Sequence, residues 1–207
     1  YHHQAGAMMR IAARAQVPLA VAEDAEVVMF RAEIGGEDHF AVLIGKGIEL
    51  EAPLVRLHSQ CITGDVLGSL KCDCGEQLQA AMKLMAEKGG GVLIYLAQEG
   101  RNIGLLNKMR AYALQDNGLD TVDANHALGF DTDERVFLPA ARILDALGIA
   151  RLRLITNNPD KISQLEQCGI KVEERVPLTL ASNPHNEDYL ATKKHRTGHM
   201  IAERDNR

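Results

Sequence analysis

Short apolar runs alternate with amphipathic stretches between residues 54 and 176, and this alternation constrains the fold more than any other feature of the sequence. The run Val92–Leu96 is apolar or aromatic throughout, which is typical of a strand buried on both faces. The preceding stretch, Glu76–Lys88, places apolar residues three and four positions apart, which is the period of an amphipathic helix. Because such elements pack in layers, we expect an α/β (α+β) fold with a mixed sheet flanked by helices.

Turn and capping signals set the bounds of these elements. Asn158 followed by Pro159 is typical of a helix start, because Asn caps the first turn and proline fits the first helical position. We expect strands at 26–34, 39–44, 53–58, 92–96, 151–155 and 170–176. We expect helices at 76–88, 105–115, 138–147 and from Asn158 to Gly169, and loops at 64–75, 98–104 and 121–133.

The length of 207 residues favours a single domain. Residues 1–7, YHHQAGA, look like the remnant of an expression tag, so their histidines are left out of any metal site. We expect an N-terminal segment at 8–25, the main domain at 26–200 and a flexible tail at 201–207.

Charge and composition argue against several classes of function. The chain has 23 Lys and Arg against 28 Asp and Glu, whereas a surface that binds nucleic acid shows a basic excess. Aromatic residues make up 4% and Trp is absent, so no stacking surface for single strands is expected. No apolar run reaches the roughly 18 residues of a membrane helix, and no secretory leader is recognisable. We therefore expect a cytoplasmic protein with no nucleic-acid or membrane partner.

Three of the four cysteines, Cys61, Cys72 and Cys74, lie within fourteen glycine-rich residues. In a cytoplasmic chain such clustering indicates a metal site or catalysis more than a disulfide. Zinc takes four ligands, so three thiolates leave one position for water, as in catalytic sites. The spacing favours this open site, but a distant His58 or His126 as fourth ligand would instead make it a closed, structural one.

Three polar segments are candidates for binding an anion. Gln98–Asn102 follows a buried strand, where ligands of α/β sheets gather, and its Arg101 offers a fork for phosphate. Thr156–Lys161 places a lysine at a helix N-terminus, where anions bind. Asp131–Arg135 pairs carboxylates with a guanidinium, although so dense a charge run is more typical of a solvated surface. Taken singly, the segments also fit ordinary capped turns; together with the cysteines they favour a site for an anionic metabolite.

The sequence resembles the GTP cyclohydrolase II family in four motifs: RLHSQCITGDVLGSLKCDCGEQL, QEGRNIGLLNKMRAYALQDNGLDTVDANHALGF, DTDER and TNNPDK. The resemblance runs from about residue 26 to 200, and it implies that this part is the catalytic domain of such an enzyme. Some members of the family carry a dihydroxybutanone-phosphate synthase domain upstream. The resemblance here covers the cyclohydrolase part of that arrangement.

The resemblance implies a zinc-dependent hydrolysis of GTP, with Mg²⁺ on the phosphates. The guanine imidazole ring opens and releases formate, and the triphosphate is cleaved with release of pyrophosphate. The product is a diaminopyrimidinone that carries ribosylamine phosphate, and the reaction is the first step of riboflavin biosynthesis. Because members of the family commonly form homodimers, a second copy of the chain is the expected partner besides GTP.

The resemblance also implies roles for individual residues. The zinc ligands are Cys61, Cys72 and Cys74. The catalytic positions are Tyr112, implicated in ring opening, and Asp133 and Arg135, the proton acceptor and nucleophile of the phosphate reaction. The positions that contact GTP are Arg56, Leu57, His58, Ser59, Gln60, Gln77, Glu99, Gly100, Arg101, Thr121, Thr156 and Lys161.

Two of these assignments leave alternatives open. A guanidinium hardly deprotonates, so Arg135 suits a clamp for charge on the α-phosphate as well as a nucleophile. Gln60 stands where the family usually has Glu, which removes a charge beside the zinc ligands. Gln60 would either read the guanine edge or orient a zinc ligand or its water.

Three other functions are less well supported. A zinc nucleobase deaminase carries a P-C-x-x-C string, which this sequence lacks. A non-catalytic zinc module that only binds a nucleotide has no need of Tyr112, Asp133 and Arg135 together. A zinc ribbon for nucleic acid is disfavoured by the absence of a fourth ligand at ribbon spacing and by the acidic net charge.

Overall fold

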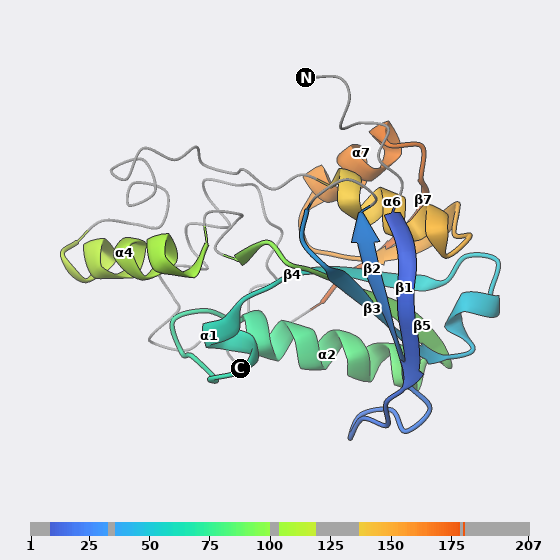
Figure 1. Ribbon diagram of the computed structural model, residues 1–207, viewed down its shortest axis with the longest axis horizontal. Coiled ribbons are helices and arrows are strands. Elements are labelled where there is room, and N and C mark those ends of the chain that lie inside the picture. Colours follow the sequence, from blue (N-terminus) through green and yellow to red (C-terminus); the bar gives the residue numbers. More distant parts are fainter. Residues whose placement is uncertain (1–8, 33–35, 100–103, 119–136, 179, 181–207) are drawn as a thin grey trace, which may run out of the picture.

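A seven-stranded sheet forms the centre of the computed structural model, which describes residues 9–32, 36–99, 104–118, 137–178 and 180 (Figure 1). Its strands lie in the order β1-β2-β3-β5-β4-β6-β7. The pairs from β1 to β5 are antiparallel and those from β5 to β7 are parallel, so the expected mixed sheet is confirmed. The strands are β1 (Met9–Gln16), β2 (Glu26–Ala32), β3 (His39–Gly45), β4 (Leu54–Ser59), β5 (Gly90–Leu96), β6 (Arg151–Ile155) and β7 (Lys171–Val176).

Helices cover both faces of the sheet, α6 and α7 on one face and α2 on the other (Figure 1). Side chains of β5 explain why its sequence is apolar throughout: Ile94 packs with α6 and α7, while Leu93 packs with α2. The helices are α1 (Ile62–Asp65), α2 (Cys74–Glu87), α4 (Leu105–Asp116), α6 (Leu138–Ala146) and α7 (Pro159–Gln167), with a short 3₁₀ helix η2 at Gly47–Glu49.

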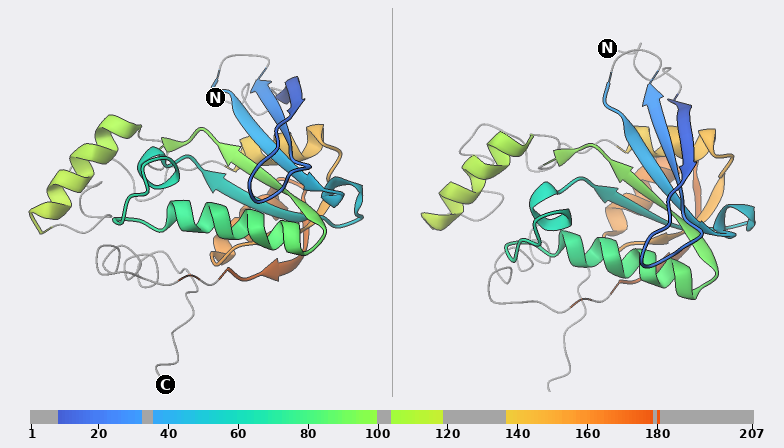
Figure 2. Two further views of the ribbon diagram at one scale, coloured as in Figure 1. Left: turned by 90° about the horizontal axis from the view of Figure 1, so that it is seen from below. Right: turned by 60° about the horizontal axis from the view of Figure 1, so that its bottom comes forward.

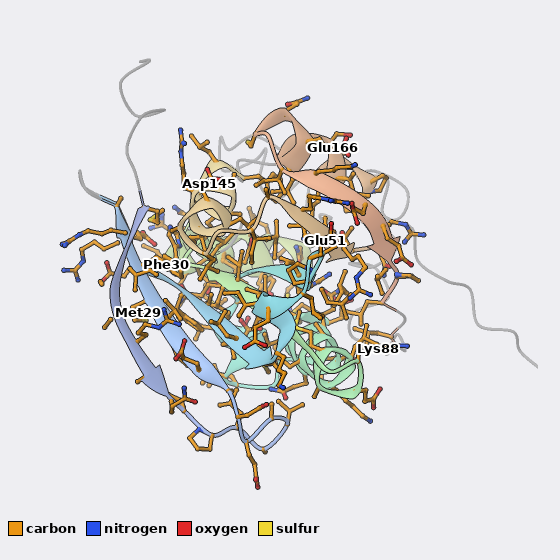
Figure 3. All side chains as sticks on the ribbon, turned by 90° about the vertical axis from the view of Figure 1, so that its right-hand side faces the viewer. Met29, Phe30, Glu51, Lys88, Asp145 and Glu166 are labelled. Carbon is orange, nitrogen blue, oxygen red and sulfur yellow. The ribbon has the colours of Figure 1, made fainter. Side chains whose placement is uncertain are left out.

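Two apolar cores fill the spaces between the sheet and these helices. Phe30 is fully buried in the core under α6 and α7, and Met85 is fully buried in the core under α2. Figure 3 shows side chains from the sheet and the helices filling these spaces, with Glu166 of α7 and Lys88 at the end of α2 at the rim. Neither core contains Cys61, Cys72 or Cys74.

The predicted elements lie within two residues of their observed bounds wherever the structure describes them. Three elements were not predicted: β1, α1 and η2. β1 gives no apolar signal because seven of its eight residues are exposed, and α1 and η2 are single turns of four and three residues. The loop expected at 121–133 and most of the loop at 98–104 lie outside the described residues.

Helix α4 lies beyond the sheet, at the end of the molecule away from β1 (Figures 1 and 2). Among its twelve residues, only Lys108 and Ala111 are buried. The helix therefore gains little from apolar packing within the described part of the chain, and it depends on specific contacts to hold its position. In that same part of the chain, no helix is long and apolar enough to cross a membrane.

Candidate metal centre

The carboxyl ends of three neighbouring parallel strands meet at one edge of the sheet. Ser59, at the end of β4, pairs in register with Leu96 at the end of β5, and β6 lies on the other side of β4. The chain leaves these ends as Gln60-Cys61, Ala97-Gln98-Glu99 and Thr156. The starts of two of the three candidate anion-binding segments, Gln98–Asn102 and Thr156–Lys161, thus lie with Cys61 on one side of the fold, the edge at which ligands of α/β sheets bind. The third segment, Asp131–Arg135, lies outside the described residues.

Three thiols converge at this edge. Cys61 precedes α1, Cys72 precedes α2, and Cys74 is the first residue of α2; their sulfur atoms lie within 4.8 Å of one another. The Sγ atoms of Cys61 and Cys72 are 3.7 Å apart. Two thiolates at about 2.3 Å from one tetrahedral zinc are separated by roughly 3.8 Å, so the arrangement fits zinc.

No fourth protein ligand joins the three thiols within the described residues. His58, one of the two histidines considered for a closed site, turns instead to Asp65, with His58 Nε2 at 2.9 Å from Asp65 Oδ1. The other, His126, lies outside the described residues. As far as the structure describes the chain, the arrangement is that of an open site.

Gly64 makes room for the thiols. A Cβ atom at this position would lie 2.8 Å from the Sγ atom of Cys72 and 3.2 Å from that of Cys61, both too close. Gly75, at the start of α2, lets the backbone of that helix come close to the backbone of α1. A Cβ at Gly75 would lie only 2.2 Å from the carbonyl oxygen of Gly64. The two glycines let α1 and the first turn of α2 touch, which brings Cys61 next to Cys72 and Cys74.

Asp65 holds the backbone beside Cys61. Its carboxylate is buried, and Oδ2 accepts hydrogen bonds from the hydroxyl of Tyr95 at 2.7 Å and from the backbone N–H of Cys61 at 3.0 Å. Its other oxygen faces His58. Burial lowers the pKa of His58, although the carboxylate of Asp65 opposes this. His58 is one of the residues predicted to contact GTP, but in the structure its Nε2 is engaged by Asp65.

Lys108 and Glu99 form a buried ion pair against the cluster. Lys108 Nζ donates to Glu99 Oε1 at 2.7 Å and to the Sγ atom of Cys61 at 2.9 Å. Burial lowers the pKa of Lys108, but the bonds to Cys61 and Glu99 outweigh burial and raise it overall. Bonds from Cys72 and Cys74, and then from Lys108, lower the pKa of the Cys61 thiol. The lysine is thus charged, and it stabilises Cys61 as the thiolate, the form that binds metal.

Tyr112 lies one turn after Lys108 on α4, on the side that faces the thiols. Its ring centroid is 5.8 Å from Lys108 Nζ and 5.1 Å from Lys71 Nζ. Burial, with further effects of Cys72 and Cys61, raises the pKa of the Tyr112 hydroxyl. The hydroxyl therefore stays protonated at neutral pH and can donate a proton.

Further polar side chains, from β4, α2 and α7, lie at the same edge of the sheet. Arg56 donates to Gln77 Oε1 at 2.8 Å and to the carbonyl of Ile155 at 3.0 Å. Thr156 and Lys161 are buried at the end of β6 and in the first turn of α7. Two cationic side chains, Arg56 and Lys161, and the N-terminus of α7 thus lie at this edge, an arrangement that suits an anion.

The remaining predicted positions have mixed placements. Ser59 donates a hydrogen bond to Gln98 at 3.4 Å, and Gln60 follows it at the strand end. The side chain of Leu57 packs in the core under α6 and α7, which leaves only its backbone for a ligand. The residues that lie outside the described part of the chain are Gly100, Arg101, Thr121, Asp133 and Arg135.

Three residues of the site were missed in the sequence: Asp65, Tyr95 and Lys108. Asp65 sits in the motif CITGD, four residues after Cys61, and this short spacing was the one available signal. Tyr95 and Lys108 reach their partners Asp65 and Cys61 from 30 and 47 residues away. Such contacts form only in the folded protein, so the local spacing of residues in the sequence does not predict them.

Comparison with known proteins gives a consistent result. A family model described as GTP cyclohydrolase II matches residues 9–177, which includes β1. The GTP cyclohydrolase-2 of Shigella boydii serotype 18 is 55% identical over 166 residues, which cover 80% of this chain and 85% of that protein. The GTP cyclohydrolase-2 of Azospirillum brasilense is 55% identical over 193 residues, or 93% of this chain, so the chain spans about half (50%) of that relative's length.

Among solved structures, a two-domain 3,4-dihydroxy-2-butanone 4-phosphate synthase from A. baumannii is similar to 84% of this chain and 41% of its own chain. Its sequence identity is 19% and its TM-score 0.47. At these values the similarity carries no weight for the fold or the function.

Proposed function

Because this chain belongs to the GTP cyclohydrolase II family, we propose that it hydrolyses GTP in the first step of riboflavin biosynthesis. In the proposed reaction the guanine imidazole ring opens and releases formate, and the triphosphate is cleaved with release of pyrophosphate. The observation that carries this proposal is the convergence of Cys61, Cys72 and Cys74 at the ligand-binding edge of the sheet. Tyr112 lies beside them and Lys161 on the same edge.

Cys61, Cys72 and Cys74 would hold the zinc ion, since their spacing fits one tetrahedral ion. A zinc ion held by these residues would act as a Lewis acid and lower the pKa of a water toward 7, which is the chemistry that the hydrolysis of the guanine ring needs. The chain's own contribution is to fix the three sulfur atoms. Gly64 allows their approach, and Asp65 holds the backbone N–H of Cys61.

Tyr112 is the proposed proton donor for ring opening. An opening ring leaves negative charge on nitrogen, and a positioned acid that protonates it lowers the barrier. The Tyr112 hydroxyl is protonated at neutral pH and so carries the proton for this role, although burial raises its pKa and makes it a weaker acid. Glu99, proposed to contact GTP, already accepts from Ile62 N–H and from Lys108, so its main contribution is to organise the site.

The phosphates of GTP would lie toward α7. The N-terminus of that helix and the charge of Lys161 both favour an anion, and Arg56 adds a guanidinium held in place by Gln77. Mg²⁺ would accompany the phosphates. The family resemblance also assigns Arg101, Asp133 and Arg135 to the phosphate reaction, with Arg135 as either nucleophile or charge clamp; these three residues lie outside the described part of the chain.

The test is an assay of the zinc-loaded protein with GTP and Mg²⁺ that follows formate and pyrophosphate separately. The wild-type chain is expected to release both products and to hold one zinc per chain. Cys72→Ser is expected to lose zinc and formate release together, because it removes a ligand. Cys168→Ser is the matched control, since Cys168 packs against the core under α6 and α7. A Cys72→Ser protein with full zinc and full formate release would contradict the proposal.

Two further proposals concern the setting of the enzyme. Clustered thiols suit the reducing cytoplasm, which is where we place the protein. The family resemblance favours a homodimer, and large apolar side chains left exposed near the cysteines support it. Both proposals rest on the reading of the chain as a member of this family.

A further inference from the structure

Lys108 is buried between two negatively charged groups that come from different parts of the chain. Its Nζ atom lies 2.9 Å from the Sγ atom of Cys61 and 2.7 Å from Oε1 of Glu99. The other oxygen of Glu99 accepts the backbone N–H of Ile62 at 2.8 Å, at the start of α1. One lysine on α4 thereby ties together the segment after β5, the turn α1 and a thiol of the cluster.

The charge of the cluster explains why a buried cation belongs there. Three thiolates around one divalent ion carry a net charge of −1, and a buried charge is costly unless it is paired. Lys108 supplies the opposite charge in direct contact with one sulfur atom. Residues that hydrogen-bond to metal ligands fix the orientation of those ligands, and their loss typically weakens metal binding by about 10–100-fold.

The same lysine makes the buried ion pair of α4 among the contacts described for that helix. Among the described residues, the helix buries only Lys108 and Ala111, so apolar packing holds it weakly. A second ion pair of α4 joins Lys71 Nζ to Asp116 Oδ1 at 2.6 Å, but both side chains are substantially exposed. Exposed ion pairs contribute little because water screens them, so of the two ion pairs described for α4 the buried one of Lys108 contributes more.

We propose that Lys108 is a positioning residue, which fixes the Cys61 thiolate as a metal ligand and anchors α4, and with it Tyr112, against the cluster. Residues four apart on a helix share a face, so a helix fixed at Lys108 presents Tyr112 to the same site. The ring of Tyr112 lies 5.8 Å from the lysine nitrogen, in agreement with this arrangement. The part of the inference that concerns Tyr112 rests on the proposed function, whereas the part that concerns metal binding does not.

The test compares Lys108→Met with Lys71→Met. Lys108→Met keeps the apolar stem but removes the charge and the donors, while Lys71→Met removes the exposed tie to α4. Zinc is expected to transfer to a competing chelator about 10–100 times more readily from Lys108→Met than from wild type. Lys71→Met is expected to stay within about twofold of wild type, and Lys108→Arg, which keeps the charge, is expected to recover part of the loss.

A second readout follows α4 itself. Hydrogen exchange of the amides of residues 105–116 is expected to become faster in Lys108→Met, whereas the amides of α2 keep the wild-type rate. In the GTP assay, kcat for formate is expected to fall more than KM rises, because Tyr112 is displaced while the phosphate side is intact. A general loss of structure would instead speed exchange in α2 as well.

The outcomes separate this inference from the proposed function. If Lys108→Met binds zinc as wild type does and exchange in α4 is unchanged, the inference is wrong, even where the wild-type chain converts GTP. If wild type releases no formate from GTP but Lys108→Met loses zinc and loosens α4, the proposed function is wrong and the inference about the metal site stands. Should Lys108→Met not fold, Lys108→Gln takes its place with the same criteria.

Discussion

Single atoms decide whether the three thiols can meet. Because Gly64 has no side chain, the Sγ atoms of Cys61 and Cys72 can lie close together. Asp65 accepts a hydrogen bond from the backbone N–H of Cys61 and so holds that residue in place. Neither Gly64 nor Asp65 is a proposed metal ligand, yet both fix the positions of cysteines that are. Substitutions at this scale can therefore remove function without removing the fold.

Gly64→Ala is expected to lower zinc content sharply while the protein stays folded. The new methyl group would lie 2.8 Å from the Sγ atom of Cys72, so the thiols have to move apart. Gly68→Ala is the control in the loop that follows α1, because a Cβ there meets nothing within 4 Å. Its positive φ of 68° costs about 1 kcal/mol of strain but should leave zinc bound. Metal analysis beside circular dichroism measures both effects, and equal zinc loss in the two variants would contradict the argument.

His39 is expected to make the fold sensitive to acid. Burial lowers its pKa, although Glu37 and Asp38 oppose the shift, and its Nδ1 accepts the backbone N–H of Ala97 at 2.9 Å. The neutral ring is favoured in the folded state, so the unfolded chain binds more protons below its own pKa of about 6.5. This contribution to stability is complete above pH 6.5 or so and is lost as pH falls, with a slope of up to about 1.4 kcal/mol per pH unit.

The check is urea unfolding at several pH values for wild type and His39→Asn. Asn offers an oxygen acceptor to the same N–H but does not titrate. The variant should lose less free energy of unfolding than wild type between pH 7.5 and pH 5, whereas parallel curves would rule out His39 as the sensing group. Other titrating groups, including His58, are common to both proteins and cancel in the difference.

The site was predictable from the sequence where its signal is local. Residue type and spacing alone predict a metal site at Cys61, Cys72 and Cys74, and in the structure these three residues lie together. Lys108 gives no such signal: a lysine on a helix is ordinarily a solvated side chain, and its thiol partner is 47 residues away. Lys108 is buried because the fold brings α4 next to Cys61 and Glu99.

At the scale of elements, the strength of the periodic signal decided what could be predicted. β5 and α2 are apolar where they face the cores, so their sequences show the expected pattern. β1 is held by hydrogen bonds to β2 and by few apolar contacts, and its exposed sequence resembles a loop. Backbone pairing leaves no residue pattern, which is why this strand escaped prediction.

The first turn of α7 is expected to depend on its cap. The side chain of Asn158 accepts the backbone N–H of Asp160 at 3.1 Å, which satisfies one of the free donors of the helix start. Asn158→Ala should lower the free energy of unfolding by about 1 kcal/mol. Asn158→Asp, which keeps an acceptor, should remain within a few tenths of wild type. Urea unfolding distinguishes the two, and an equal loss in both variants would show that the amide group has another role.

At the scale of the whole molecule, the exposed apolar side chains of the described residues gather mainly in two segments. Six of the nine large apolar side chains that are exposed in the described residues lie at positions 66–70 and on α4, including Val66 at 74% and Leu106 at 65% exposure. These two segments adjoin the cysteines in sequence or in space, and Lys71 joins them through Asp116. A surface of this kind is typical of an interface between subunits.

The chain is therefore expected to form a homodimer, with about twice its mass of 22.6 kDa in light scattering. Leu106→Glu combined with Leu67→Glu should shift the protein toward the monomer, because a buried unpaired charge opposes association. Leu50→Glu is the control, since this exposed leucine ends η2, away from that surface. A wild-type monomer, or a double variant that remains a dimer, would assign these side chains no part in association.

The three thiols lie outside the two apolar cores, and this separation bears on whether folding or metal loading comes first. No atom of the cysteine cluster is needed to complete either core, because both are built from the sheet and α2, α6 and α7. We therefore expect the chain to form both cores without metal, so that metal loading can follow folding rather than drive it. A chain that lacks the ion would then keep its architecture and lack only the chemistry that the metal supplies.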